Sequence, residues 1–141
     1  MDFQPSKYSG PVSDLYMEQL NDSQRDAVSH FEGPLLVLAG AGSGKTRVLT
    51  TRIANLINQH GVSPDRILAV TFTNKAAGEM RNRITSMLGE DPEGMWVSTF
   101  HALGARMLRR HAQRLGWNNT FSIFDAEQSL KLIKKATENV G

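Results

Sequence analysis

Residues 35–46 carry the strongest structural signal in the chain and read Leu35-Leu36-Val37-Leu38-Ala39-Gly40-Ala41-Gly42-Ser43-Gly44-Lys45-Thr46. The apolar part predicts a strand over residues 34–39, the small residues predict a tight turn, and a helical pattern begins near Lys45. In such a turn the backbone N–H groups converge with the helix N-terminus, where the helix dipole also favours an anion. The segment therefore predicts a loop that binds the phosphates of a nucleoside triphosphate.

The residue types of this loop, positions 39–46, suggest separate roles. Gly40, Gly42 and Gly44 let the backbone approach phosphates in conformations that a Cβ would forbid. We expect Lys45 to reach the β and γ phosphates and the Thr46 hydroxyl to ligate Mg²⁺. Ala39 replaces the first glycine of the general pattern G-x-x-x-x-G-K-[ST]. The alternative, a glycine-rich turn with a lysine after it by chance, explains neither the strand pattern before it nor the helix pattern after it.

The composition is that of an ordinary globular chain of 141 residues, 40% hydrophobic and 21% charged. No apolar run approaches the roughly 18 residues of a membrane helix, and the first residues lack the basic-then-apolar order of a signal peptide. The sequence contains no cysteine, which excludes disulfides and thiolate metal sites and fits a reducing compartment. We expect a cytoplasmic protein that does not associate with membranes.

The charge is unevenly distributed along the chain. The net charge is +2, made up of −4 over residues 1–40, +6 over residues 41–114 and 0 over residues 115–141. The basic part contains the phosphate loop. This distribution suggests a polyanionic partner in addition to a nucleotide.

Apolar periodicity and capping signals predict alternating helices and strands. Asn21 and Gln24 predict a capping box at the start of a helix that reaches about Phe31. A helix from Lys45 is expected to end at Gly61. The further predicted elements are a strand buried on both faces over 67–72, a helix over 75–88 closed by Gly89, a strand over 95–100, a helix over 101–115, a short extended segment over 121–124 and a helix from Asp125 with Gln128 as its capping partner. This alternation predicts an α/β fold with a parallel sheet.

Two polar stretches follow predicted strands at the carboxyl edge of the sheet, where open α/β folds bind ligands. The first is Thr71-Phe72-Thr73-Asn74-Lys75-Ala76-Ala77, which suits phosphate contacts and a ring for base stacking. It is equally compatible with an N-cap at Thr73 or Asn74 and a buried Phe72. The second is Ser98-Thr99-Phe100-His101, in which His101 either donates to a phosphate or serves in capping or packing. Arginines 106, 109, 110 and 114 share one side of the next helix, which is either a nucleic-acid face or a solvated one.

Taken together in order, these segments resemble the UvrD/PcrA/Rep group of superfamily 1 DNA helicases. The resemblance covers about residues 15–135 and rests on Leu20-Asn21-x-x-Gln24, the loop 39–46, the stretch 69–77 with Glu79-Met80-Arg81, and the stretch 98–101. Ala39 in the phosphate loop is itself typical of this group. The resemblance implies an incomplete RecA-like P-loop NTPase core, with a parallel sheet flanked by helices, followed by the start of an inserted helical subdomain. It divides the chain into a flexible arm (1–13), an ATP-binding core (14–124) and the insert (125–141).

The resemblance also implies roles for matched positions. Gln24 would read the adenine edge and Arg47 would pack on the adenine face. Phe72 would stack on a base of single-stranded DNA, and Thr73, Asn74, Thr99 and His101 would contact the strand. The implied cofactors are ATP and Mg²⁺. The implied partners are single-stranded DNA and duplex junctions, a second RecA-like domain of a longer chain, and repair or replication proteins; the implied polarity is 3′ to 5′.

Hydrolysis by such an enzyme requires an acidic pair that holds Mg²⁺ and activates water. Asp125 and Glu127 are not adjacent and follow a short segment interrupted by Ser122, so we interpret them as the start of the helical insert. The chain alone is therefore expected to bind ATP and part of the DNA without hydrolysis. A non-catalytic module for nucleotide and single strands remains the alternative. A small-molecule kinase would need an acidic residue and a substrate lid, and neither is evident in the sequence.

Overall fold

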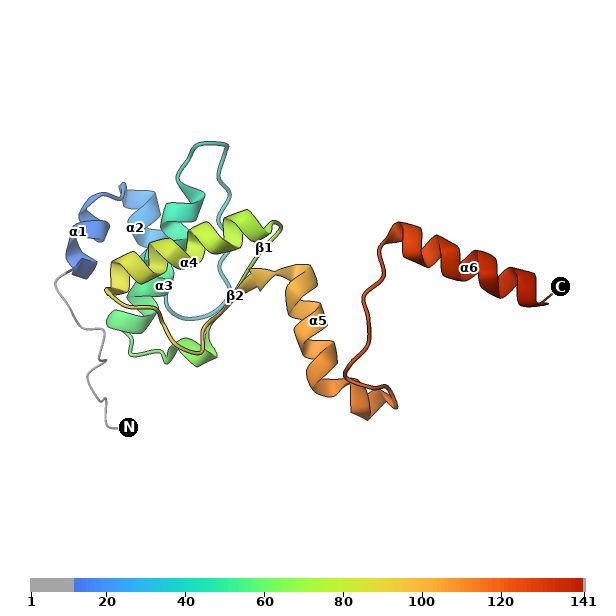
Figure 1. The fold of residues 1–141 in the computed structure, drawn as a ribbon. Coiled ribbons are helices and arrows are strands. Elements are labelled where there is room, and N and C mark those ends of the chain that lie inside the picture. The colour runs from blue at the N-terminus through green and yellow to red at the C-terminus, as the bar shows by residue number, and fades with distance from the viewer. Residues whose placement is uncertain (1–11, 141) are drawn as a thin grey trace. The chain divides into compact units, whose positions relative to one another are not determined.

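The structure, a computed structural model, describes residues 12–140 (Figure 1). Its helices and strands are α1 (Val12–Glu18), α2 (Asp22–Ser29), α3 (Lys45–Asn58), β1 (Leu68–Thr71), α4 (Asn74–Leu88), β2 (Trp96–Thr99), α5 (Phe100–His111) and α6 (Ala126–Val140), with 3₁₀ turns at Pro64–Arg66 and Ala112–Leu115. The predicted arm lies outside the described residues except for positions 12 and 13, where α1 begins. The chain forms two compact units that divide after Ala102. Within residues 12–140, no helix combines the length and the apolar character needed to cross a membrane.

The sheet consists of β1 and β2, which run parallel and are joined through α4. The register pairs Leu68 with Trp96 and Thr71 with Thr99. This confirms the predicted parallel α/β arrangement in its coarse form. Leu68 is 54% exposed and Ala69 is 5% exposed, so β1 buries one face and the expectation of burial on both faces is wrong. In the described residues the sheet has only two strands, and the helices packed on it do not cover both of its faces.

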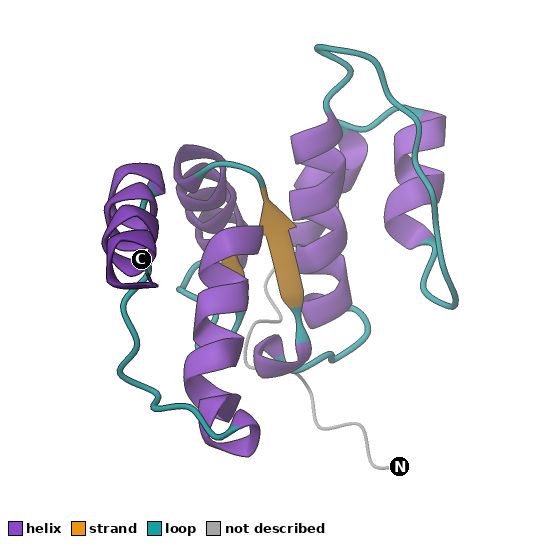
Figure 2. Cartoon of the chain, turned by 90° about the vertical axis from the view of Figure 1, so that its right-hand side faces the viewer, coloured by secondary structure: helices purple, strands orange, loops and turns teal. Residues whose placement is uncertain are grey.

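The strand expected over residues 34–39 is absent, and this prediction is wrong for the structure. The segment has no regular secondary structure, and Leu36 and Leu38 are 82% and 87% exposed. A strand needs a neighbour to pair with its N–H and C=O groups. No described segment pairs with residues 34–39, which Figure 2 shows as a loop apart from the orange strands.

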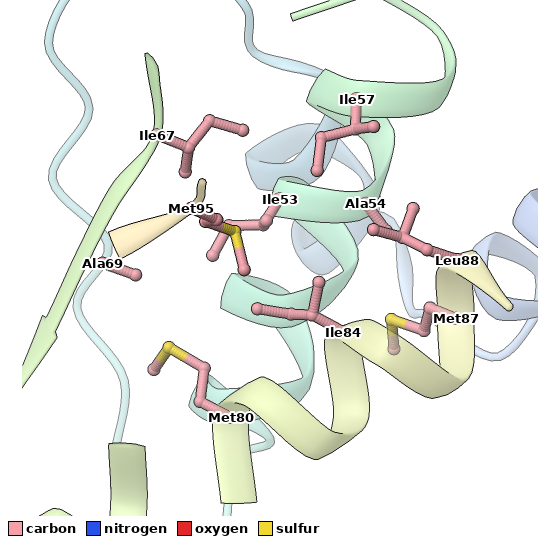
Figure 3. Close-up of a cluster of buried hydrophobic side chains, with 10 residues drawn as sticks. All are labelled: Ile53, Ala54, Ile57, Ile67, Ala69, Met80, Ile84, Met87, Leu88 and Met95. Atoms are coloured by element: carbon pink, nitrogen blue, oxygen red, sulfur yellow. The ribbon is translucent and has the colours of Figure 1, made fainter. Parts of the chain in front are cut away.

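The main core lies between α3, α4 and the sheet. Its central side chains are Ile57 and Ile84, which are 1% and 0% exposed. In Figure 3 the side chains of α3 and α4 point toward one another and toward Ala69 and Met95. The cluster comprises Ile53, Ala54, Ile57, Ile67, Ala69, Met80, Ile84, Met87, Leu88 and Met95. Burial of these side chains fixes α3, whose first turn follows the phosphate loop.

A smaller cluster attaches α2 to α3. It consists of Leu20, Ala27, Val28 and Val48. The Arg52 guanidinium adds a polar link, because it donates to the carbonyl of Ala27 at 2.8 Å and also to that of His30. These carbonyls lie in the last turn and C-cap of α2, where the helix leaves acceptors unsatisfied. Helix α2 is thus held against α3 at both its apolar face and its end.

The predicted helix boundaries are confirmed where local capping signals exist. Gly89 closes α4 with φ 81°, and Gly61 lies at φ 61° where the Val62 amide donates to the Leu56 carbonyl at 2.9 Å. At the start of α6, the Asp125 and Gln128 side chains each accept from the other's backbone amide. The helix predicted over 101–115 is α5 followed by a 3₁₀ turn that ends at Gly116. Within the second unit, the Arg109 guanidinium lies 5.6 Å from the Phe121 ring centroid, so this arginine is not merely solvated.

Candidate nucleotide and strand-binding site

The phosphate loop is shaped by two glycines in the left-handed region. Gly42 has φ 72° and Gly44 has φ 82° as the N-cap of α3. The Ser43 hydroxyl donates to the Gly40 carbonyl at 2.7 Å, which closes the turn before the helix. Residues with a Cβ rarely adopt these φ values. The small-residue pattern of the sequence is thus explained by the backbone it forms.

Lys45 begins α3 and turns back over the loop. Its Nζ donates to the carbonyl of Ala39 at 3.2 Å and also to that of Gly40. The side chain is exposed. An ammonium held by two neutral carbonyls can exchange them for phosphate oxygens, because hydrogen bonds between charged partners are stronger.

Gln24 links helix α2 to the phosphate loop. Its Oε1 accepts from the backbone N–H of Asn21 at 3.0 Å, and its own backbone N–H donates to Asn21 Oδ1 at 2.9 Å. These two bonds confirm the predicted capping box. Its Nε2 donates to the Ser43 carbonyl at 3.0 Å. A Cβ added at Gly44 would lie 3.1 Å from the same Nε2. The φ of Gly44 therefore favours glycine, and a Cβ there would also crowd the end of the Gln24 side chain.

An open cavity of 460 Å³ unites most residues of the predicted nucleotide site. Its lining consists of Gln24, Gly42, Ser43, Gly44, Lys45, Thr46, Arg47 and Arg83. Three cationic side chains and the N-terminus of α3 face this cavity, and no carboxylate lines it. The electrostatics are those of an anion site.

Two outcomes at this cavity differ from the sequence analysis. Arg83, an exposed residue of α4, lines the cavity, but the sequence analysis did not assign it to the nucleotide site. It lies two positions after Arg81. Ala39 and Gly40 line a second cavity of 570 Å³, which shares Gln24, Ser43 and Lys45 with the first. Its other lining residues are largely apolar and include Leu35, Leu38, Val48 and Leu49. Ala41 lies in the turn and lines neither of these cavities.

The residues around Thr46 fit a magnesium ion that a nucleotide brings with it. Thr46 is exposed in the first turn of α3 and lines the same cavity as Lys45. The described residues hold no group of three or more His, Cys, Asp or Glu side chains that could bind a metal. Mg²⁺ prefers oxygen ligands and keeps several waters, so one hydroxyl with phosphate oxygens suits it better than a cage made by the protein.

The predicted strand-binding residues lie where β1 and β2 end. Phe72 follows β1 and is 89% exposed, so it does not belong to the core. The Thr73 hydroxyl accepts from the Ala76 amide at 3.1 Å and caps α4, and the exposed Asn74 is the first residue of that helix. The capping alternative is thus realised at Thr73, while the ring of Phe72 stays available.

At the end of β2 the hydroxyl of Thr99 has a similar structural role. It accepts from the Ala102 amide at 3.2 Å, and Thr99 is 6% exposed. His101 is exposed on the first turn of α5. Of the two residues, His101 is accessible to a ligand, whereas Thr99 positions the start of the helix.

Three carboxylates, those of Asp125, Glu127 and Asp91, are bound to groups outside the nucleotide cavity. Asp125 caps α6 through the bond between its Oδ1 and the Gln128 amide at 2.8 Å, and Glu127 pairs with Lys131 at 2.7 Å. Asp91 accepts from the Arg81 guanidinium at 2.7 and 3.0 Å, and this hydrogen bonding holds the pKa of the Asp91 carboxyl below its usual value. Arg81 therefore anchors the loop after α4, in contrast to Arg83.

Comparison with known proteins gives a consistent result. The family model described as UvrD/REP helicase N-terminal domain matches residues 20–140. The chain is 51% identical to the ATP-dependent DNA helicase PcrA of Bacillus subtilis (strain 168) over 123 residues, which are 87% of this chain and 17% of that relative. It is 49% identical to the ATP-dependent DNA helicase UvrD1 of Mycobacterium bovis over 138 residues, 96% of this chain and 18% of that relative. The chain thus spans less than a fifth of the length of the curated relatives it matches.

Proposed function

The chain belongs to the UvrD/REP helicase N-terminal domain family, and we propose that it forms the ATP-binding part and a share of the DNA-binding part of an ATP-dependent DNA helicase or translocase. The observation that carries this proposal is the cavity that Lys45, Arg47 and Arg83 line together with the first residues of α3. A triphosphate supplies the negative charge that this arrangement lacks.

Each lining residue has a role that its chemistry supports. Lys45 binds the β and γ phosphates, and the backbone amides of residues 42–46 donate to phosphate oxygens. Thr46 ligates Mg²⁺, which neutralises phosphate charge when bound. Gln24 offers a donor and an acceptor to the adenine edge, and the Arg47 guanidinium packs on the adenine face. Arg83 contributes a third cation at the same cavity.

The strand-binding part consists of Phe72, Thr73, Asn74, Thr99 and His101 at the ends of β1 and β2. Phe72 offers an exposed ring on which a base of single-stranded DNA stacks. Asn74 and His101 supply polar contacts to the backbone of the strand. Thr73 and Thr99 hold the two helix starts that present these side chains.

Hydrolysis and movement require parts that these residues do not supply. We assign the acidic pair and the transition-state arginines to a longer chain with a second RecA-like domain, since Asp125 and Glu127 are engaged in capping and in an ion pair. In that protein, ATP binding and release would drive translocation along single-stranded DNA, 3′ to 5′, up to duplex junctions. Its setting would be the cytoplasm, with repair or replication proteins as partners.

The nucleotide part of the proposal is tested by Mg-ATP binding to the 141-residue chain, measured by calorimetry. Lys45→Ala removes charge-assisted hydrogen bonds worth about 1.5–3 kcal/mol, so we expect affinity to fall by about 10- to 150-fold. Lys134→Ala, which removes the same charge from α6, is the matched control and should bind like the unaltered chain. Equal affinity of the Lys45 and Lys134 variants would contradict the assignment.

The strand-binding part is tested by fluorescence anisotropy with a labelled oligothymidylate. Phe72→Ala should weaken binding by about 1–3 kcal/mol if a base stacks on the ring. Because Phe72 is 89% exposed, its removal should leave the free energy of unfolding nearly unchanged. Unchanged affinity together with lost stability would return Phe72 to a structural role.

A further inference from the structure

A second aromatic ring lies beside Phe72. The parallel register pairs Thr71 with Thr99, so the next residues, Phe72 and Phe100, leave the sheet side by side. Their ring centroids are 5.4 Å apart and the ring planes are tilted by 50°. Phe100 is 51% exposed and was not among the residues that the sequence assigned to the strand-binding site.

The backbone on both sides of this ring pair is fixed by hydrogen bonds. The Thr73 hydroxyl caps α4 immediately after Phe72, and the Thr99 hydroxyl caps α5 immediately before Phe100. Both rings are therefore presented from the first residues after a strand rather than from a loose loop. Around them lie the exposed polar residues Asn74 and His101.

The tilt between the rings decides what the second ring can do. A base stacks on an aromatic face, and two rings tilted by 50° cannot both lie flat on one base. A tilted pair is itself a favourable arrangement, in which the edge of one ring contacts the face of the other. Phe72 is 89% exposed despite this contact, so its ring can touch Phe100 and still offer a face to a base.

We infer that Phe100 is a positioning residue of the strand-binding site: it restricts the ring of Phe72 to an orientation in which a base of single-stranded nucleic acid can stack on it. The inference rests on the proposed function and adds a residue that acts through Phe72. A ring that is already restricted loses less rotational freedom when the base binds, which favours binding.

The test measures oligothymidylate affinity by anisotropy with Phe100→Leu and Phe100→Tyr in the 141-residue chain. Without Phe100, the base itself must order the Phe72 side chain, which should weaken binding by about 2- to 13-fold; tyrosine, which keeps the ring, should restore it. The slope of affinity against salt concentration should stay the same, because phosphate contacts are unchanged. Phe31→Leu is the matched control. Phe31 is 47% exposed and follows α2 rather than a strand, and its ring centroid lies 4.1 Å from that of His60, on which it stacks.

A double-mutant cycle separates positioning from a general structural effect. In a Phe72→Ala background, Phe100→Leu should cause no further loss of affinity. An equal loss in both backgrounds overturns the inference, because Phe100 would then act independently of Phe72. Normal binding by Phe100→Leu overturns the inference alone and leaves the proposed function intact. No binding by the unaltered chain overturns the proposed strand-binding function and this inference with it.

Discussion

The replacement of Gly44 by alanine tests how the phosphate loop is held. Gly44 combines φ 82° with a position where an added Cβ would lie 3.1 Å from Gln24 Nε2. That nitrogen donates to the Ser43 carbonyl at 3.0 Å. The alanine methyl therefore introduces backbone strain and also crowds the side chain that ties α2 to the loop.

The size of each effect follows from the geometry. The left-handed conformation costs a residue with a Cβ about 1–2 kcal/mol, and weakening of the Gln24 hydrogen bond adds up to about 1.5 kcal/mol. Gly42→Ala carries the first cost only, since Gly42 has φ 72° and an added Cβ meets no atom within 4 Å. Gly78→Ala in helix α4 meets no atom either and should stabilise the chain by about 0.5–1 kcal/mol.

The assay is urea unfolding of the three variants, with Mg-ATP affinity measured in parallel. We expect the free energy of unfolding to decrease in the order Gly78→Ala, unaltered chain, Gly42→Ala, Gly44→Ala, and nucleotide affinity to be lowest for Gly44→Ala. If Gly44→Ala matched Gly42→Ala in both measurements, crowding of Gln24 would be refuted. The double variant with Gln24→Ala gives a second check, because the additional cost of Gly44→Ala should then disappear.

Three further variants test the packing, the ion pair and the helix cap. Ile84→Ala leaves a cavity in the core, because Ile84 is 0% exposed. It should lower the free energy of unfolding, measured with urea, by about 2–5 kcal/mol. Asp91→Asn should lower the thermal midpoint at neutral pH, because Arg81 lowers the folded-state pKa of Asp91. This stabilisation is present above the ordinary aspartate pKa of 3.8 and is lost as the pH falls through the lowered pKa. The two proteins should therefore converge in acid, and a constant difference would contradict the ion pair. Asn21→Ala removes the cap of α2 and should cost about 0.5–2 kcal/mol in urea unfolding, whereas Asn21→Asp, which keeps an acceptor, should cost less.

Features that depend on a few neighbouring residues could be predicted from the sequence. The capping boxes at Asn21 and Asp125 and the closing glycine at Gly89 occur as expected. Each involves partners three to four residues apart, so the sequence pattern contains both members of the interaction. Lys45 was assigned from the loop motif, whereas Gln24 and Arg47 were assigned from a family resemblance; the three residues line one cavity.

Features that depend on distant partners could not be predicted. The apolar pattern of residues 34–39 is that of a strand, but a strand also needs a neighbour, and none of the described residues pairs with it. Arg83 reaches the cavity because α4 packs on α3, which no local pattern encodes. The contact of Phe72 with Phe100 depends on the register of two strands separated by a helix.

The geometry of Gln24 shows how a local cap and a distant contact can share one side chain with a ligand. A carboxamide has two N–H donors and an oxygen with two lone pairs. The cap uses one lone pair, through the Asn21 amide, and the loop uses one N–H, through the Ser43 carbonyl. One N–H and one lone pair remain, which is the number that the adjacent acceptor and donor of an adenine edge require. By this count, adenine recognition by Gln24 under the proposed function requires neither the cap nor the loop contact to break.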